Sequence, residues 1–345
     1  MAVPAARAFE GDGPNRFYPQ QWRQFRITTR VTLPDAPGPA QLWVPLAQTA
    51  GDYQLASAPG WGDENRAKVV HDARYGAPVA WMSWKEADPA PRQLEVEQVV
   101  AVRDRATDSQ ALVPLTAAER QFWTAPTANM PLDGIVLATA ATVTAGRDTP
   151  RERLRALYDW VVENTHRDPD VPGCGRGNIK TMLETGAPGG KCADINGLLV
   201  SLARASGFPA REVYGIRTGP SRLFPSLGAS GDISKAQHCR AEVFLEGAGW
   251  LPVDPADVRK VVLEDRIPLE AGEVRTLREQ LFGSWEMNWI GYNSAEDITL
   301  PGSDGPHWPD FAFLMYPHAV TAEGSRSCLD PASFRYEITS TELIV

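Results

Sequence analysis

Three residues whose side chains together can catalyse acyl transfer occur in this chain in the order Cys192, His238 and Asp254. A thiolate can attack a carbonyl carbon, an imidazole can move the proton, and a carboxylate can hold the imidazole in the useful tautomer. These residue types indicate nucleophilic acyl chemistry. They do not identify the substrate, and the neighbouring segments must bring the three side chains together.

The segment around Cys192 predicts a helix that begins at this cysteine. Residues 189–194 read Gly-Gly-Lys-Cys-Ala-Asp, apolar residues then recur at helical spacing, and Gly207 with Pro209 is a typical helix end. Unpaired N–H groups and the positive end of the helix dipole favour a thiolate at such a position. The N–H of Cys192 is then a natural oxyanion donor, and we expect Asp194 to be a first-turn helix residue.

The residues just before Cys192 are candidates for substrate binding. Gly189 and Gly190 have no Cβ, which would let a substrate backbone approach the thiol. Lys191 either adds positive potential beside the thiolate or faces solvent. We therefore name Gly190 and Lys191 as substrate-binding candidates.

A hairpin is predicted to carry the other two residues. Segments 238–245 and 250–254 read as strands around the turn Glu246-Gly247-Ala248-Gly249. His238 begins the first strand and Asp254 ends the second, so antiparallel pairing brings them to the same end of the sheet. In the simpler interpretation, Asp254 only forms a turn before Pro255. The loop 218–236 before the hairpin is either a mobile lid or a long surface connection.

The rest of the chain divides by pattern. Residues 25–33, 41–46 and 93–103 read as strands in a region without a clear helix, which predicts a β-sandwich-like domain over 15–125. A helix start at Thr149-Pro150-Arg151-Glu152 belongs to a catalytic core over 140–262. Residues 263–345 are expected to complete the core or pack on the β domain, through a helix near 269–282 and a closing strand over 333–345.

These segments resemble the transglutaminase-like superfamily. The resemblance rests on Gly-Gly-Lys-Cys-Ala-Asp with Gly-Phe-Pro-Ala-Arg downstream (189–211), on His-Cys-Arg-Ala-Glu-Val-Phe-Leu (238–245) and on Gly-Trp-Leu-Pro-Val-Asp-Pro (249–255). It implies a papain-like α+β fold, in which a helix carrying the cysteine packs on an antiparallel sheet carrying His and Asp. It also implies Cys192 as nucleophile, His238 as acid–base and Asp254 as orienting carboxylate.

The resemblance also bears on the oxyanion donors, the substrate groove and metal ions. Members of the family usually have a second oxyanion donor from an upstream aromatic or amide side chain, for which Trp160 and Asn178 are the candidates here. Trp285, with other aromatic residues nearby, could form the wall of a peptide groove, although core packing is the commoner use of such residues. No acidic cluster resembles the calcium sites of animal members, so we expect no metal and no cofactor.

Composition limits the partners and the location. The chain has 345 residues and a formal net charge of −9, without a basic stretch, which argues against nucleic acid. No apolar run is long enough to span a membrane. Ala6-Arg7-Ala8 has the form of a signal-peptidase site. Residues 1–14 are thus a signal-peptide remnant of a periplasmic or secreted protein, or the disordered start of a cytoplasmic one. Export would allow one disulfide among Cys174, Cys239 and Cys328.

Two functions from different classes fit these observations. The first is a cysteine-dependent enzyme that transfers the acyl group of a peptide or protein amide through a thioester, either to water or to an amine. The second is a peptide- or protein-binding module that has kept the fold without the chemistry. Oligomeric state is left open.

Overall fold

The computed structural model describes residues 21–34, 37–61, 66–88, 91–106, 113–303, 313–332 and 334–344. The possible cleavage site at residues 6–8 lies outside this part of the chain. Among the described residues, no helix is both long and apolar enough to cross a membrane.

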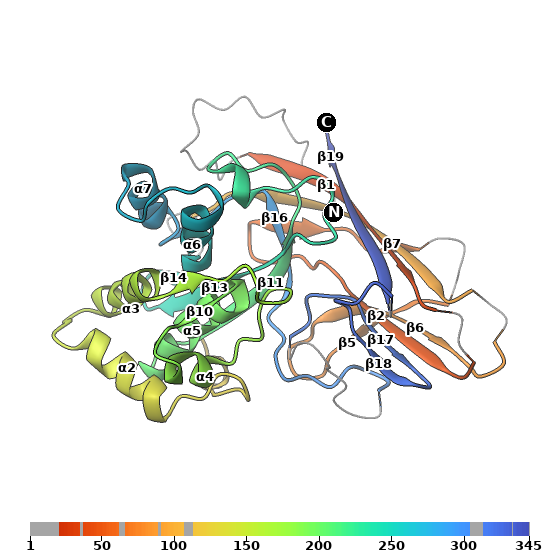
Figure 1. Cartoon of the computed structure of the whole chain (residues 1–345), viewed down its shortest axis with the longest axis horizontal. Coiled ribbons are helices and arrows are strands. Elements are labelled where there is room, and N and C mark those ends of the chain that lie inside the picture. The colour runs from red at the N-terminus through yellow and green to blue at the C-terminus, as the bar shows by residue number, and fades with distance from the viewer. Residues whose placement is uncertain are drawn as a thin grey trace.

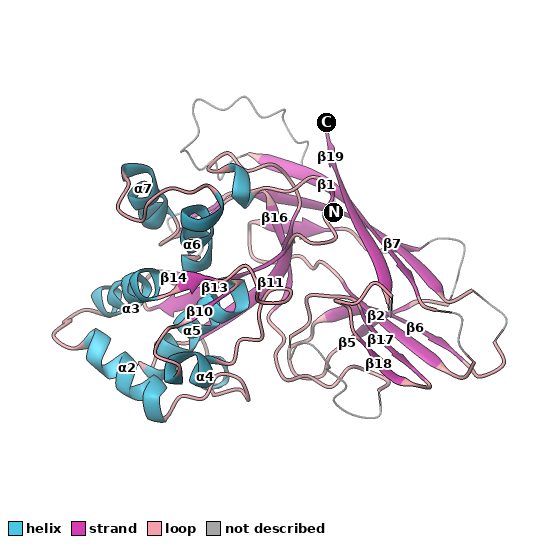
Figure 2. Ribbon diagram, in the orientation of Figure 1, coloured by secondary structure: helices cyan, strands magenta, loops and turns pink. Residues whose placement is uncertain are grey.

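Helices and strands are both abundant: most of the helices lie together around a smaller sheet, and the longer strands lie on the other side of the molecule (Figure 1, Figure 2). The helices are α1 Ala117–Trp123, α2 Gly134–Thr144, α3 Pro150–Asn164, α4 Ile179–Glu184, α5 Cys192–Ala205, α6 Pro255–Glu264 and α7 Gly272–Gln280, with a short 3₁₀ turn at Pro225–Leu227. The strands of the first region are β1 Trp22–Thr32, β2 Ala40–Pro45, β3 Gln54–Ala56, β4 Gly60–Trp61, β5 Lys68–His71, β6 Pro78–Trp84, β7 Gln93–Arg103 and β8 Arg105–Ala106. The later strands are β9 His166–Arg167, β10 Gly189–Gly190, β11 Ala210–Arg217, β12 Gly231–Asp232, β13 Gln237–Leu245, β14 Gly249–Val253, β15 Ser284–Trp285, β16 Trp289–Asn293, β17 His318–Thr321, β18 Gly324–Arg326 and β19 Arg335–Leu343.

A four-stranded antiparallel sheet with α5 against it forms the centre of the α+β part. Its strand order is β14-β13-β11-β16. Helix α5 is buried from Cys192 to Arg204, apart from Asp194, which is half-buried. Its apolar side chains join those of β13 and β14 in one core. The predicted helix start at the cysteine and the predicted His–Asp hairpin are therefore confirmed as elements of the fold.

Two larger sheets form a sandwich, built from strands β1 to β7 together with the later strands β12, β17, β18 and β19. The sandwich therefore includes residues beyond the predicted span of 15–125. One sheet has the order β12-β19-β1-β7-β3 with β4 also paired to β7, and the other has the order β18-β17-β2-β6-β5. Their facing side chains, such as Val31, Leu42, Met82 and Val96, form a separate core. Alternation along β1 and β7 explains part of this arrangement, because Val31, Leu94 and Val96 lie on the face of their strands that points into this core.

The long strands β1 and β7 connect the sandwich to the helical part (Figure 1). At one end of β1, Val31 packs in the sandwich core. At the other end, Phe25 packs with Val100 of β7 and with Ile216 and Ile290 of the four-stranded sheet. A single pair of strands thus supplies apolar surface to both regions, and the position of the four-stranded sheet depends on them.

The chain after residue 263 contributes to all three larger sheets. Strand β16 pairs with β11, strand β17 pairs with β2, and strand β19 pairs with β1. Strand β12, in the long loop before the hairpin, pairs with β19 through Gly231 and Asp232. The loop 218–236 is thus held to the sandwich at β12. The tail helix α7 is shorter than the expected span of 269–282.

The start of α3 has the predicted capping arrangement. The Thr149 side chain accepts a hydrogen bond from the N–H of Glu152 (3.2 Å), and the Glu152 carboxylate accepts one from the N–H of Thr149 (2.9 Å). Helix α3 packs on α5 through a buried face that includes Leu154, Leu157 and Val161. The cap therefore fixes one of the helices that support the cysteine helix.

Replacing Thr149 with alanine is expected to lower the free energy of unfolding by about 1 kcal/mol, because the first turn of α3 loses its side-chain acceptor. Urea unfolding followed by circular dichroism measures this. Thr149→Ser retains a hydroxyl and should recover most of the loss. A serine variant as unstable as the alanine variant would contradict the capping explanation.

Candidate active site

The three residues singled out from the sequence meet at one end of the four-stranded sheet. Cys192 is the first residue of α5, His238 is the second residue of β13, and Asp254 follows β14 directly. All three are buried, with Cys192 and His238 exposing 3% and 2% of their surface. Cys192 and His238 line a cavity of about 590 Å³. The thiol and the imidazole can thus be reached through this cleft.

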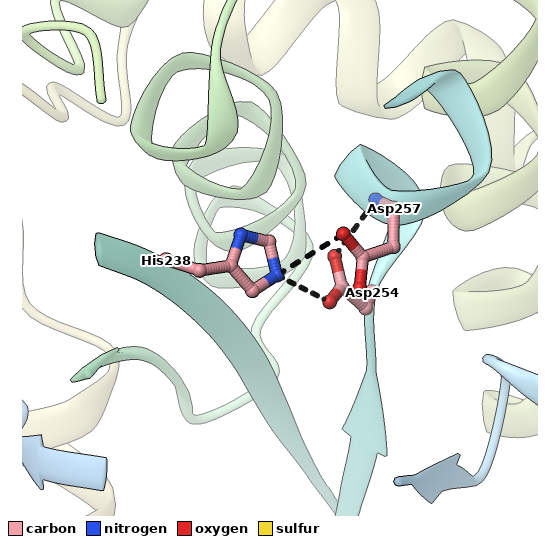
Figure 3. A group of neighbouring side chains, drawn as sticks. All are labelled: His238, Asp254 and Asp257. Carbon is pink, nitrogen blue, oxygen red and sulfur yellow. Dashed lines mark hydrogen bonds and ion pairs between the residues drawn. The ribbon is translucent and has the colours of Figure 1, made fainter. Parts of the chain in front are cut away.

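The imidazole of His238 is held by a carboxylate (Figure 3). Its Nε2 lies 2.8 Å from Oδ2 of Asp254. This contact leaves Nδ1 for Cys192, and the His238 and Cys192 side chains interact directly. Asp254 is also the N-cap of α6, since its Oδ1 accepts the N–H of Asp257 (3.1 Å). Asp254 thus both caps α6 and holds the imidazole of His238.

A second carboxylate, which was not predicted from the sequence, contacts the same imidazole nitrogen. Oδ1 of Asp257 lies 3.4 Å from Nε2 of His238 (Figure 3). Both carboxylate oxygens of Asp257 accept hydrogen bonds from Arg217, which is buried on β11. The segment Asp-Pro-Ala-Asp at 254–257 could have indicated this contact. It is typical of a helix start in which the third helical residue, here Asp257, turns back toward the N-cap Asp254.

The charges of Arg217, Asp254 and Asp257 affect the protonation state of His238. Burial would raise the pKa of the Asp257 carboxyl, but Arg217 and then His238 hold that pKa well below its usual range. Burial and then Asp257 raise the pKa of Asp254. Burial and Arg217 act to lower the pKa of His238, yet Asp257 and Asp254 outweigh them and raise it. The arrangement favours an imidazolium.

Ligand atoms of His238, Asp254 and Asp257 lie within 4.8 Å of one another, a spacing that could also hold a metal ion. Two buried guanidinium groups already face these carboxylates. Arg217 binds Asp257, and Nε of Arg240 lies 3.6 Å from Oδ2 of Asp254. Positive charge at both carboxylates disfavours a further cation there, so the group is better described as an imidazole held by two compensated carboxylates.

Two more thiols surround the Cys192 sulfur. Burial would raise the pKa of Cys192, but hydrogen bonds with the Cys174 and Cys239 side chains, and then with His238, bring this pKa well below its ordinary value. Burial raises the pKa of Cys174 and of Cys239 well above theirs. The Cys174 thiol also donates to the carbonyl of Gln237 (3.2 Å). Of these three cysteines, Cys192 is thus the one placed to be a thiolate, and all four cysteines of the chain are free thiols.

The start of α5 is organised by Asp194. Its carboxylate accepts the N–H groups of Lys191 (2.9 Å), Gly177 (2.9 Å) and Arg176 (3.1 Å). A Cβ on Gly190 would collide with the Asp194 side chain. The space on the Cβ side of Gly190 is therefore filled by Asp194. The missing side chain at this position allows the helix start to form.

Asn196 joins the cysteine helix to the hairpin. It lies one turn after Cys192 and is fully buried. Its Nδ2 donates to the carbonyl of Cys239 (2.8 Å) and to Oδ1 of Asp254 (3.3 Å). Burial of an amide is favourable only with such partners, so this residue fixes the distance between the helix and the carboxylate. In the sequence, an amide side chain among the apolar residues of this helix could have indicated such a buried role for Asn196.

The remaining candidates lie in different places. Lys191 lines the cavity with Cys192 and His238. Asn178 caps α4 by accepting the N–H of Thr181, and Trp160 packs against the helical core, so neither lines this cavity. Trp285 is buried and donates to the carbonyl of Val253, which makes it a core residue. Gln237 does line the cavity, and its amide is a better-placed candidate for a second oxyanion donor.

Comparison with known proteins identifies the family of the segment that carries the site. The family model of the transglutaminase-like superfamily matches residues 137–255, which include all three residues. An uncharacterized protein of Haemophilus influenzae is 34% identical over 339 residues, covering 93% of this chain and 91% of its own.

The solved structures that match this chain have low sequence identity to it. One is described as "a Putative Cysteine Protease from Cytophaga hutchinsonii"; the match has 15% identity and a TM-score of 0.51, and covers 86% of this chain and 96% of that one. The periplasmic domain of TgpA from Pseudomonas aeruginosa gives 17% identity and a TM-score of 0.36, over 73% of this chain and 92% of that domain.

Alkylation of Cys192 by iodoacetamide should stay fast below neutral pH. The rate follows the thiolate, whose lowered pKa extends its range downward, whereas an ordinary thiol reacts about tenfold more slowly for each pH unit below ~8.5. Intact-mass kinetics from pH 5 to pH 9 measure this, with Cys192→Ala to assign the label. In His238→Gln the rate should begin to fall at a higher pH. A profile that the glutamine leaves unchanged would contradict the thiolate–imidazolium pair.

Gly190→Ala should slow the same alkylation by about 10²-fold, because displacing Asp194 moves the start of α5 and misplaces the thiol. Iodoacetamide is too small to need room beside Gly190. If this glycine served only substrate approach, the rate would therefore be unchanged. Gly60→Ala is the matched control, because a Cβ there meets only ordinary contacts. Circular dichroism confirms that each variant is folded.

Proposed function

Because this chain belongs to the transglutaminase-like superfamily, we propose that it is a cysteine-dependent enzyme that transfers the acyl group of peptide or protein amides. The single observation that carries the proposal is the contact series from the Cys192 thiol through His238 to Asp254, buried beside an accessible cleft. A binding module would not need a thiolate whose charge is supported in this way.

The reaction follows from the positions of the groups. The Cys192 thiolate attacks the amide carbon, and the N–H of Cys192, which has no intrahelical acceptor at the first helix position, stabilises the oxyanion together with a second donor such as Gln237. The carbon–nitrogen bond breaks, and His238 gives its proton to the leaving amine. The product of this half-reaction is a thioester on Cys192.

Water or a second amine then resolves the thioester. His238 accepts a proton from the incoming nucleophile, the carbon–sulfur bond breaks, and the thiolate is restored. Water is the favoured acceptor in our proposal, because basic side chains and a serine share the cleft wall with its aromatic residues. A lining of this kind keeps water in the site, unlike a dry aromatic tunnel.

We also propose a periplasmic or secreted location, on the basis of Ala6-Arg7-Ala8. The alternative is the cytoplasm. Immunodetection of the natural gene product in separated periplasmic and cytoplasmic fractions distinguishes the two.

A peptide-amide library in ¹⁸O-labelled water, with and without a fluorescent primary amine, tests the reaction. The expected result is labelled carboxyl products that disappear in Cys192→Ala, with amine adducts as the minor fraction. Asp254→Asn should lower kcat by about 10²–10⁴-fold, since the imidazole loses its orienting carboxylate. Adducts as the main product would identify an amine transferase. No product, together with ordinary thiol reactivity of Cys192, would favour the binding module.

A further inference from the structure

The cavity beside Cys192 is lined by charged side chains of one sign. Its six strongly basic residues are Arg167, Lys191, Arg217, Lys235, Lys260 and Arg335. No aspartate or glutamate is among the described residues that line it, although the whole chain has a formal net charge of −9. A cleft lined by one sign of charge concentrates ligands of the opposite sign.

Three of these six cations form ion pairs with carboxylates that do not line the cavity. Arg217 pairs with Asp257, Arg167 pairs with Glu264 at 2.9 Å, and Lys260 lies 3.5 Å from the same Glu264. Within the described part of the chain, no ion pair is formed by the other three, Lys191, Lys235 and Arg335. Arg167 and Lys260 share one carboxylate, and Lys191, Lys235 and Arg335 have none within ion-pair distance among the described residues, so the cleft keeps a net positive charge.

The basic residues come from segments that are far apart in the sequence. Arg167 lies in β9, opposite Gly190 of β10 and therefore close to the start of α5. Lys191 directly precedes Cys192, Lys235 lies three residues before His238, and Arg335 begins β19. The fold thus gathers positive charge around the thiol and the imidazole from four separate segments.

The same cavity also has an apolar wall. Leu329, Phe334 and Tyr336 line it from the last part of the chain, and Tyr316 is buried at its side. Its volume of about 590 Å³ falls in the range of roughly 300–1,000 Å³ typical of ligand sites. Apolar surface suits the backbone and side-chain stems of a peptide, and the cations suit carboxylates at the ends of those stems.

We infer that the substrate is an acidic peptide segment, with aspartate or glutamate side chains next to the amide that Cys192 attacks. This inference rests on the proposed function and specifies its substrate class. Carboxylates on short stems reach the unpaired cations while the amide stays at the thiol.

Protection of Cys192 from iodoacetamide tests the peptide class. Acetylated tetraglutamate amide should slow labelling at concentrations where tetraglutamine amide, which has nearly the same shape, has no effect. The protection should weaken as salt is added. Equal protection by the two peptides would overturn the inference. So would equal protection by inorganic phosphate at the same total charge, because it would show a site for small anions only.

Two reagents that differ mainly in charge test the cations themselves. The ratio of labelling rates for iodoacetate and iodoacetamide should fall at least about fivefold in Lys235→Gln/Arg335→Gln, because the cleft loses two of its positive charges. The control Lys68→Gln/Lys85→Gln removes the same charge from two exposed lysines that do not line the cavity and should keep the native ratio. An unchanged ratio in the first variant overturns the inference alone. A Cys192 that reacts with neither reagent overturns the proposed function as well.

Discussion

Burying an imidazole between two carboxylates is the constraint on which the site depends. Removing charged groups from water is costly unless other charges and hydrogen bonds replace the solvent. Here Arg217 and Arg240 supply the charge, and Asn196 and the start of α6 supply hydrogen bonds. Each of these partners belongs to a different element, so α5, α6, β11 and β13 must keep their relative positions for the imidazole to remain charged.

The thiol benefits from the same arrangement. Cys192 occupies a helix start whose geometry is fixed by Asp194, and its sulfur lies among two neutral thiols and the imidazole. A buried thiolate without such neighbours would take up a proton. The nucleophile is thus maintained by its surroundings more than by exposure to solvent, and the cleft gives access to it from one direction.

Local patterns in the sequence were sufficient to predict the main helices and strands of the central part of the fold. The helix at Cys192, the hairpin with His238 and Asp254, and the sandwich strands have regular periodicity and clear turn residues, and the segments also identify the family. Asp257 and Arg217 could not be paired from the sequence, because 40 residues separate them and the contact exists only after β11 and α6 pack. The contact of Gly190 with Asp194 was also not visible in the sequence, because it depends on how the first turn of α5 folds back on the residues before it. The place of Trp285 could not be decided from the sequence either, because an aromatic residue in a binding groove and one in the core have the same sequence pattern.

The pairing of β1 with β19 has a consequence for the timing of assembly. Strand β1 (Trp22–Thr32) pairs with β19 (Arg335–Leu343), which is far from it in the sequence. Leu329, Phe334 and Tyr336, which lie at or near the start of β19, form part of the cleft wall. Contacts of such sequence separation form late, after most of the chain has been ordered. A growing chain that has already made Cys192, His238 and Asp254 therefore still lacks the wall that shapes their cleft. The thiol therefore faces a formed binding site only after Leu329, Phe334 and Tyr336 have been made and have packed.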